Sequence, residues 1–255
     1  MTIEHNPNKL IGASKELIEV EPTLETFKKY QKQDLQCSVD PGDSAVPEGA
    51  REYFDRHGYL IIKNLYSPTE LYHPVPSVRG SIKYFGSKDK FVHEPEEKQV
   101  VGSVARYSHP HYKTIHTNIR LILQDILGKE LYNTYYYDRY YFAGQRLDRH
   151  SDRDACEVSV SVQVSTNSDQ PWPFCIETPN GEERACTLQN GWGLLYKGCE
   201  RQHWRDPLKS RYTRKRDKLK NWITKKEDDT YHHQIFFHYV LADGPRAHCA
   251  GDLSS

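Results

Sequence analysis

The sequence predicts a mainly β protein with flanking helices, built on a sandwich or jelly roll. Strand-like runs recur through the second half of the chain, at 132–142, 157–165, 174–177, 193–197 and 233–240. Turn-forming residues separate these short runs. That spacing is typical of a sandwich or jelly roll and not of a parallel α/β sheet.

Two helices and one further strand are indicated before these runs. Residues 47–57 predict a short helix that ends at Gly58, because glycine readily adopts the left-handed conformation of a C-terminal cap. Residues 59–62 follow as a buried strand. Isoleucines recur at helical spacing over 114–127 and Gly128 follows them, so this helix is expected to cover one sheet.

The length and charge of the chain limit its organisation. With 255 residues, the chain is expected to form a polar, partly helical segment over 1–45 and one domain over 46–255. Within that domain we expect a β core at about 132–240 and a basic insert at 205–230. Lys+Arg and Asp+Glu balance at 35 each, which argues against nucleic acid or an anionic membrane as the main partner.

Neither a membrane span nor a secretory signal is expected. No apolar run is long enough to cross a bilayer, and the N-terminus is polar. The six cysteines are scattered without metal-binding spacing, so reduced thiols are expected. A cytoplasmic location is the default expectation.

His150 and Asp152, with His203 further along the chain, are the candidate metal ligands. Residues two apart in a strand point to the same face, so His150 and Asp152 are able to approach one ion together. Two imidazoles and one carboxylate leave open positions on Fe(II). Rival ligand sources are His109 with His111 and the group at 232, 233 and 238, although adjacent histidines point apart in a strand.

The residues around these ligands resemble a known family. In the run 141–145 (Tyr-Phe-Ala-Gly-Gln), Gly144 lies six residues before His150, and the run 193–196 (Gly-Leu-Leu-Tyr) precedes His203. This pattern resembles the prolyl-4-hydroxylase-like branch of the Fe(II)/2-oxoglutarate dioxygenases over roughly 132–240. The resemblance implies a cupin-like double-stranded β-helix with Fe(II) at its mouth, and 2-oxoglutarate and O2 as cosubstrates.

In that family a cation holds the far carboxylate of 2-oxoglutarate, about ten residues beyond the second histidine. Position 213 is a threonine, so the match is inexact. Arg211 is favoured as the anchor, with Arg214 and Arg205 as rivals and Tyr141 as the hydroxyl partner. Alternatively, these arginines decorate a solvated loop.

Four further residues are candidate substrate contacts. The segment 99–107 lies where this family places substrate-facing loops. Arg79, Tyr107 and Arg153 are candidates to bind a substrate carboxylate, and Glu157 to orient Arg153 or a substrate amine. Each of them also suits an ordinary ion pair or a surface position.

The favoured function is an oxygenase that removes hydrogen from an unactivated C–H of a small, carboxylate-bearing, amino-acid-like molecule. Hydroxylation or oxidative cyclisation, including ring closure as in kainoid synthases, would follow. Halogenation is disfavoured, because related halogenases have a small residue in place of Asp152.

The alternatives are a peptidyl or protein hydroxylase and a non-catalytic metal-binding jelly roll. An RNA-binding module is a further alternative, since 205–226 holds ten Lys or Arg against two Asp. The oligomeric state stays open.

Overall fold

Strands dominate the part of the chain that the computed structural model describes, which is residues 50–71, 91–212 and 228–252. In chain order the elements are α3 (Ala50–His57), β1 (Tyr59–Ile62), β2 (Val92–Glu94), β3 (Ser103–Tyr107), α4 (Tyr112–Leu127), β4 (Leu131–Phe142), β5 (Leu147–His150), η5 (Asp154–Cys156), β6 (Val158–Thr166), β7 (Phe174–Glu177), β8 (Glu183–Cys186), β9 (Gly193–Tyr196), β10 (His203–Arg205), β11 (Tyr231–Leu241) and η6 (Ala247–Cys249).

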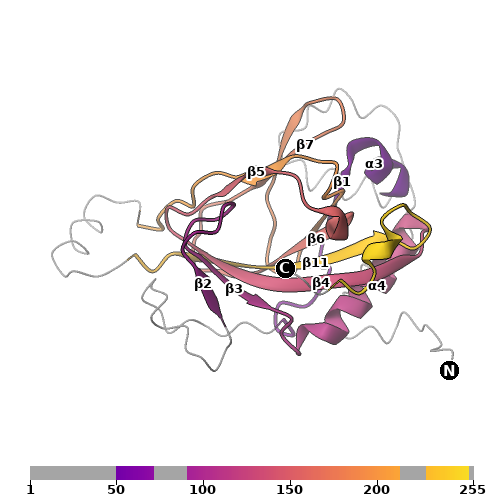
Figure 1. Cartoon of the computed structure of the whole chain (residues 1–255). Coiled ribbons are helices and arrows are strands. Elements are labelled where there is room, and N and C mark those ends of the chain that lie inside the picture. The colour runs from indigo at the N-terminus through magenta and orange to yellow at the C-terminus, as the bar shows by residue number, and fades with distance from the viewer. Residues whose placement is uncertain (1–49, 72–90, 213–227, 253–255) are drawn as a thin grey trace.

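The strands form two antiparallel sheets that face each other (Figure 1). The large sheet has the order β1-β9-β6-β11-β4-β3-β2, and the small sheet the order β5-β10-β7-β8. From β4 onward the chain passes between them: β4, β6, β9 and β11 belong to the large sheet, and β5, β7, β8 and β10 to the small one. This connectivity is a double-stranded β-helix, so the predicted jelly roll is confirmed.

Side-chain alternation along β11 separates two layers of the core. Ile235, Phe237 and Tyr239 pack in one cluster with the isoleucines of α4. Phe236 belongs to a second cluster, which includes Leu147 of β5 and aromatic residues of both sheets. The even-numbered residues of β11 therefore face the small sheet, where the functional site lies.

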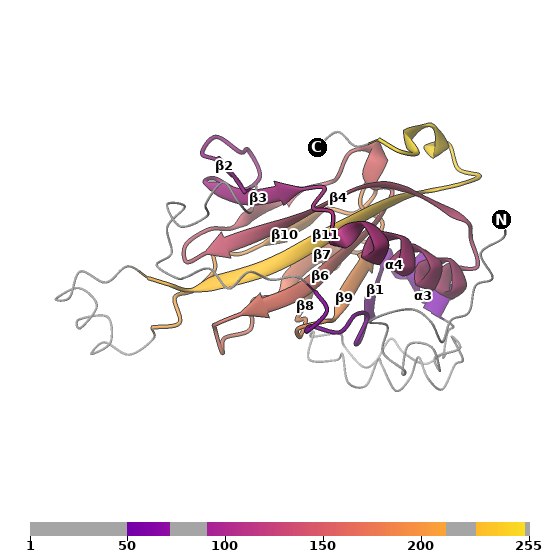
Figure 2. The ribbon, with the colours of Figure 1, turned by 90° about the horizontal axis from the view of Figure 1, so that it is seen from below.

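Both predicted helices end at glycine, as expected. Gly58 adopts a φ of 78° and donates its backbone N–H to the carbonyl of Phe54 at 2.8 Å. Gly128 does the same with a φ of 60° and the carbonyl of Gln124. Figure 2 shows α4 lying across the large sheet, and Figure 1 places it on the side away from β5 and β7. The prediction that this helix covers one sheet is confirmed.

The six predicted strands all form, with ends within two residues of those expected. Five strands were not predicted: β2, β3, β5, β8 and β10. They have three to five residues each, and most carry charged side chains, so they lack an apolar alternation that would mark them. The segment 99–107, expected to be a loop, contains β3.

Several expectations concern residues outside the described ranges. These are the polar segment 1–45, Arg79 and most of the basic run 205–226. Among the described residues, no helix is long and apolar enough to cross a membrane. The five cysteines described by the structure are free thiols, as expected.

Candidate metal centre

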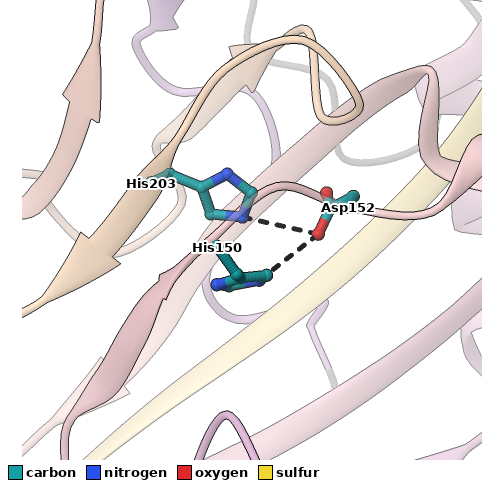
Figure 3. A group of neighbouring side chains, drawn as sticks. All are labelled: His150, Asp152 and His203. Atoms are coloured by element: carbon teal, nitrogen blue, oxygen red, sulfur yellow. Dashed lines mark ion pairs between the residues drawn. The ribbon is translucent and has the colours of Figure 1, made fainter.

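Two neighbouring strands of the small sheet bring the three predicted ligands together. β5 and β10 pair antiparallel with His150 opposite His203, and Asp152 follows β5 directly. Asp152 Oδ1 lies 3.5 Å from His150 Nε2 and 3.4 Å from His203 Nε2. Figure 3 shows both rings turning a nitrogen toward the carboxylate. Three donor atoms therefore face one small volume.

Backbone carbonyls fix the orientation of both imidazoles. His150 Nδ1 lies 2.7 Å from the carbonyl oxygen of Asp148, and His203 Nδ1 lies 3.0 Å from that of Arg201. Because a carbonyl only accepts hydrogen bonds, each Nδ1 carries the proton and donates it. Each Nε2 therefore faces the centre: it donates to Asp152 when the ring is protonated, and it presents a lone pair to a metal ion when the ring is neutral, which is the arrangement found in metal-binding histidines.

The separations fit a single metal ion. Ligand atoms bonded at about 2.1 Å to one ion lie no more than about 4.2 Å apart. The two measured Nε2–Oδ1 separations, 3.5 and 3.4 Å, fall within this limit. Two nitrogens and one carboxylate oxygen are a donor set suited to Fe(II) with positions left open for other ligands.

Asp152 is held in an ionised state by its surroundings. Burial disfavours the charged carboxylate, but the neighbouring His203 and His150 outweigh burial and hold the pKa of Asp152 well below its usual range. Its backbone N–H donates to the carbonyl of Gly198 at 2.9 Å, and Ser159 Oγ donates to Oδ2 at 3.2 Å. The carboxylate is therefore ready to bind a cation.

Gly198 approaches this carboxylate so closely that no larger residue fits. A Cβ at position 198 would lie 2.5 Å from Asp152 Oδ2, 2.8 Å from Ser159 Oγ and 2.3 Å from the carbonyl oxygen of Cys156. The glycine therefore lets the turn after β9 supply the carbonyl that orients Asp152.

A second group of possible ligands, Asp152, Cys156 and His238, also lies within 4.8 Å. Burial raises the pKa of the Cys156 thiol, and its sulfur lies 3.2 Å from the hydroxyl of Tyr135. A thiol that keeps its proton is a poor metal ligand, because the thiolate is the binding form. The triad of His150, Asp152 and His203 is the better candidate.

A cavity of about 210 Å³ adjoins the triad. Tyrosines form much of its lining, at positions 107, 135, 137, 141 and 196. Glu97, Gln99, Arg139 and Arg153 add charged and polar groups to it. Because polar groups and aromatic rings together line a small volume, the cavity suits a compact polar ligand.

The structure places three of the predicted binding residues in this cavity: Tyr141, Tyr107 and Arg153. Arg153 Nη1 forms an ion pair with Asp252 at 2.7 Å. Glu157 does not line the cavity. It accepts the backbone N–H of Leu241 at 2.9 Å and pairs with Arg246 at 3.2 Å. Its expected role, to orient Arg153 or a substrate amine, stays a prediction.

Of the arginines expected to anchor 2-oxoglutarate, Arg211 and Arg205 do not line the cavity. Arg211 forms two hydrogen bonds of 2.8 Å with Asp229, whose carboxylate already neutralises it. Arg205 is buried, donates to the carbonyl of Trp172 at 2.6 Å and stacks on its ring; burial lowers the pKa of Arg205 to about 10. Arg214 and Arg79 lie outside the described residues.

The sequence analysis missed Arg139, which does line the cavity. Its side chain is 3% exposed, and Nε and Nη1 have no hydrogen-bond partner among the described residues, nor does the hydroxyl of Tyr141. The nearest carboxylate, that of Glu97, is 3.9 Å from Nη2. A buried cation with spare donors calls for an anion. Its position two residues from Tyr141 on a predicted strand was the available signal.

Solved structures with this fold exist, although no known protein family and no curated protein sequence matches the chain. An oxidoreductase of the 2OG-Fe(II) oxygenase family from Burkholderia pseudomallei is similar, with a TM-score of 0.54 and 11% identity over 81% of this chain and 93% of that one. The non-heme alpha-ketoglutarate-dependent carbocyclase SnoK from nogalamycin biosynthesis is also similar, with a TM-score of 0.54 and 12% identity over 83% of this chain and 94% of that one. A Pseudomonas putida prolyl-4-hydroxylase has a TM-score of 0.50 and 12% identity over 74% of this chain and 96% of that one. The chain has the fold of these oxygenases.

The pairing of β4 with β11 fixes the level of Arg139 in the fold. The inner face of β11 carries the uncharged Gln234 at this level. Arg139 of the neighbouring strand β4 stands directly opposite Gln234 in the register of the two strands. The positive charge is therefore present at the same level of the barrel, on a different strand.

Proposed function

We propose that this protein is an Fe(II)- and 2-oxoglutarate-dependent oxygenase acting on a small, carboxylate-bearing, amino-acid-like substrate. The observation that carries this proposal is the convergence of His150, Asp152 and His203 beside the cavity. The fold shared with solved oxygenases supports it. A cavity of about 210 Å³ favours small molecules over a folded protein segment.

His150, Asp152 and His203 are the proposed ligands of Fe(II), which with 2-oxoglutarate and O2 supplies the oxidant for C–H cleavage, releasing succinate and CO2. The protein residues bind and orient the reactants and limit access of water. The same three ligands serve hydroxylation and oxidative ring closure alike. Which of the two follows depends on how the cavity positions the target carbon, and we keep kainoid-type ring closure as one proposed outcome.

Arg139 and Tyr141 are the proposed anchor for the far carboxylate of 2-oxoglutarate. Their unpartnered donors are buried in the lining of the cavity that adjoins the triad. A guanidinium binds a carboxylate through two parallel hydrogen bonds, and the tyrosine hydroxyl adds a third donor. This assignment replaces Arg211, which already pairs with Asp229.

Anaerobic titration tests the proposed function. Protein loaded with Fe(II) should develop a weak visible charge-transfer band when 2-oxoglutarate is added, and Asp152→Ala should abolish it. Substrate-stimulated succinate release is then screened with glutamate derivatives, free amino acids and proline-rich peptides. Stimulation by peptides alone would favour a peptidyl hydroxylase. Absence of both the band and succinate release would refute the oxygenase function, and RNA binding that weakens steeply with salt would favour the binding module.

A further inference from the structure

The two carboxylate oxygens of Asp152 have different partners. Oδ1 lies 3.5 Å from His150 Nε2 and 3.4 Å from His203 Nε2, and both dashed contacts in Figure 3 end on this one oxygen. Oδ2 instead accepts a hydrogen bond from Ser159 Oγ at 3.2 Å. An ion held between the two imidazoles would therefore meet Oδ1, while Oδ2 is already engaged by the protein.

The hydrogen bonds around Ser159 show where its single proton goes. Ser159 is fully buried on β6, and its Oγ lies 3.2 Å from Asp152 Oδ2, 3.1 Å from the carbonyl oxygen of Cys156 and 2.9 Å from His238 Nδ1. The first two atoms only accept hydrogen bonds. If Ser159 donated to His238, both acceptors would face its oxygen without a proton between them. His238 Nδ1 therefore donates to Ser159, and the serine proton is left for the oxygens, of which the charged carboxylate is the stronger acceptor.

His238 is held firmly in the position from which it donates. Its side chain is 2% exposed, and the ring centroids of Tyr135 and Tyr137 lie 4.6 and 5.9 Å from its own. In the part of the chain that the structure describes, Nε2 has no hydrogen-bond partner, so the bond to Ser159 is the one that this ring forms there. His238 therefore fixes the Ser159 oxygen beside Asp152.

We propose that Ser159, fixed in turn by His238, is a positioning residue that keeps Asp152 a one-oxygen metal ligand. This inference rests on the proposed function and extends it to the number of metal positions left for the reactants. A six-coordinate ion bound by one atom each from His150, Asp152 and His203 has three positions left. A second bond from Asp152 would leave one position fewer.

Removal of the Ser159 hydroxyl should turn the carboxylate toward the ion. Without it, Oδ2 and the carbonyl oxygen of Cys156 have no proton between them, and two acceptor oxygens repel each other. Gly198 closes another side, since a Cβ there would lie only 2.5 Å from Oδ2. The bound cation is then the favourable partner that remains for this oxygen.

Counting the water molecules on bound Mn(II) tests the proposal without 2-oxoglutarate or turnover. Line broadening in electron paramagnetic resonance, measured in water enriched in ¹⁷O, gives this count. We expect three waters on wild type and two on Ser159→Ala. If Ser159→Ala fails to fold, Ser159→Gly removes the same hydroxyl.

Ser161→Ala is the matched control. Ser161 is also fully buried on β6, and its Oγ lies 2.8 Å from the side-chain amide of Gln234, so the variant also loses one buried hydroxyl and its hydrogen bond. It should keep three waters. Two waters on wild type, three on Ser159→Ala, or the same loss in both variants would overturn the inference.

Nuclear magnetic resonance tests the direction of the hydrogen bonds in metal-free protein. In protein labelled with ¹⁵N-histidine, the resonances missing from His238→Asn identify this ring. We expect its Nδ1 to be protonated. A proton on Nε2 alone would mean that Ser159 donates to His238 and not to Asp152, which would overturn the inference.

A functional measurement separates this inference from the proposed function. With Fe(II), 2-oxoglutarate and O2, succinate release by Ser159→Ala should be at least about ten-fold slower than that of wild type, and that of Ser161→Ala should be unchanged. Equal rates of Ser159→Ala and wild type would overturn the positioning role and leave the oxygenase function standing. Failure of wild type to respond to 2-oxoglutarate at all would instead refute the proposed function.

Discussion

Replacing Gly198 by alanine should weaken metal binding, although position 198 contributes no ligand atom. The new Cβ would lie 2.3, 2.5 and 2.8 Å from three oxygen atoms, including Asp152 Oδ2. One of the three is a backbone carbonyl, so the strain is not relieved by rotating a side chain. Either the turn or the carboxylate must move. Disturbing a residue that orients a metal ligand typically lowers metal affinity about 10- to 100-fold, and we expect a loss in this range.

The assay is calorimetric titration of metal-free protein with Fe(II) under argon, together with denaturant unfolding. Overpacking should lower the free energy of unfolding by about 1–3 kcal/mol. Gly193→Ala is the matched control, because its Cβ would lie 2.5 Å from Leu65 Cδ2, in the core cluster that contains Leu65. That variant should lose stability and keep its Fe(II) affinity. Wild-type Fe(II) affinity in folded Gly198→Ala would refute the reasoning.

Three further outcomes are expected. Arg139→Gln should raise the Kd of 2-oxoglutarate about 30-fold or more, because a buried charge pair is lost. The control Arg211→Gln should leave this Kd unchanged. Equal effects of the two variants in calorimetry would contradict the assignment of Arg139 as the anchor. Burial lowers the pKa of His116 to about 3, so the folded protein holds it neutral, and the associated stability, complete above about pH 6.5, falls as the pH drops toward 3. Between pH 7 and pH 5 this should remove about 2 kcal/mol from metal-free protein in denaturant unfolding, and a His116→Gln variant with the same pH slope would contradict it. Mn(II) at about 100 times its Kd should raise the free energy of unfolding of the wild type by about 2.7 kcal/mol. It should not change the free energy of unfolding of the Asp152→Ala variant. Equal stabilisation of the two proteins would mean that the ion binds at another site.

Local patterns in the sequence were sufficient to predict the architecture and the triad. Long strands such as β6 carry alternating valines, and both helices end at glycines, so these elements are encoded by neighbouring residues. The spacing of His150 and Asp152 was the local signal for the pair, although β5 ends at His150 and Asp152 lies just beyond it. The strands β5 and β10, which place the triad, are short and polar, and only their pairing in the folded sheet defines them.

The cation and the cavity histidine depend on contacts between strands far apart in the chain. Arg139 faces Gln234 through the register of β4 and β11, which no local pattern specifies. The contact between His238 and Ser159 likewise joins β11 to β6. Charged residues also occur in the core: Arg106 pairs with Asp138 at 2.8 Å, and both are fully buried. A strand position in the sequence therefore does not reveal whether a polar side chain is buried, paired or directed into a cavity.

Diffraction at the iron absorption edge, from crystals prepared without oxygen with Fe(II) and 2-oxoglutarate, tests the metal centre most directly. We expect one anomalous peak within bonding distance of His150 Nε2, Asp152 and His203 Nε2, with the cosubstrate extending from it to Arg139. Iron bound at other residues, or no peak between these three side chains, would contradict the proposed centre.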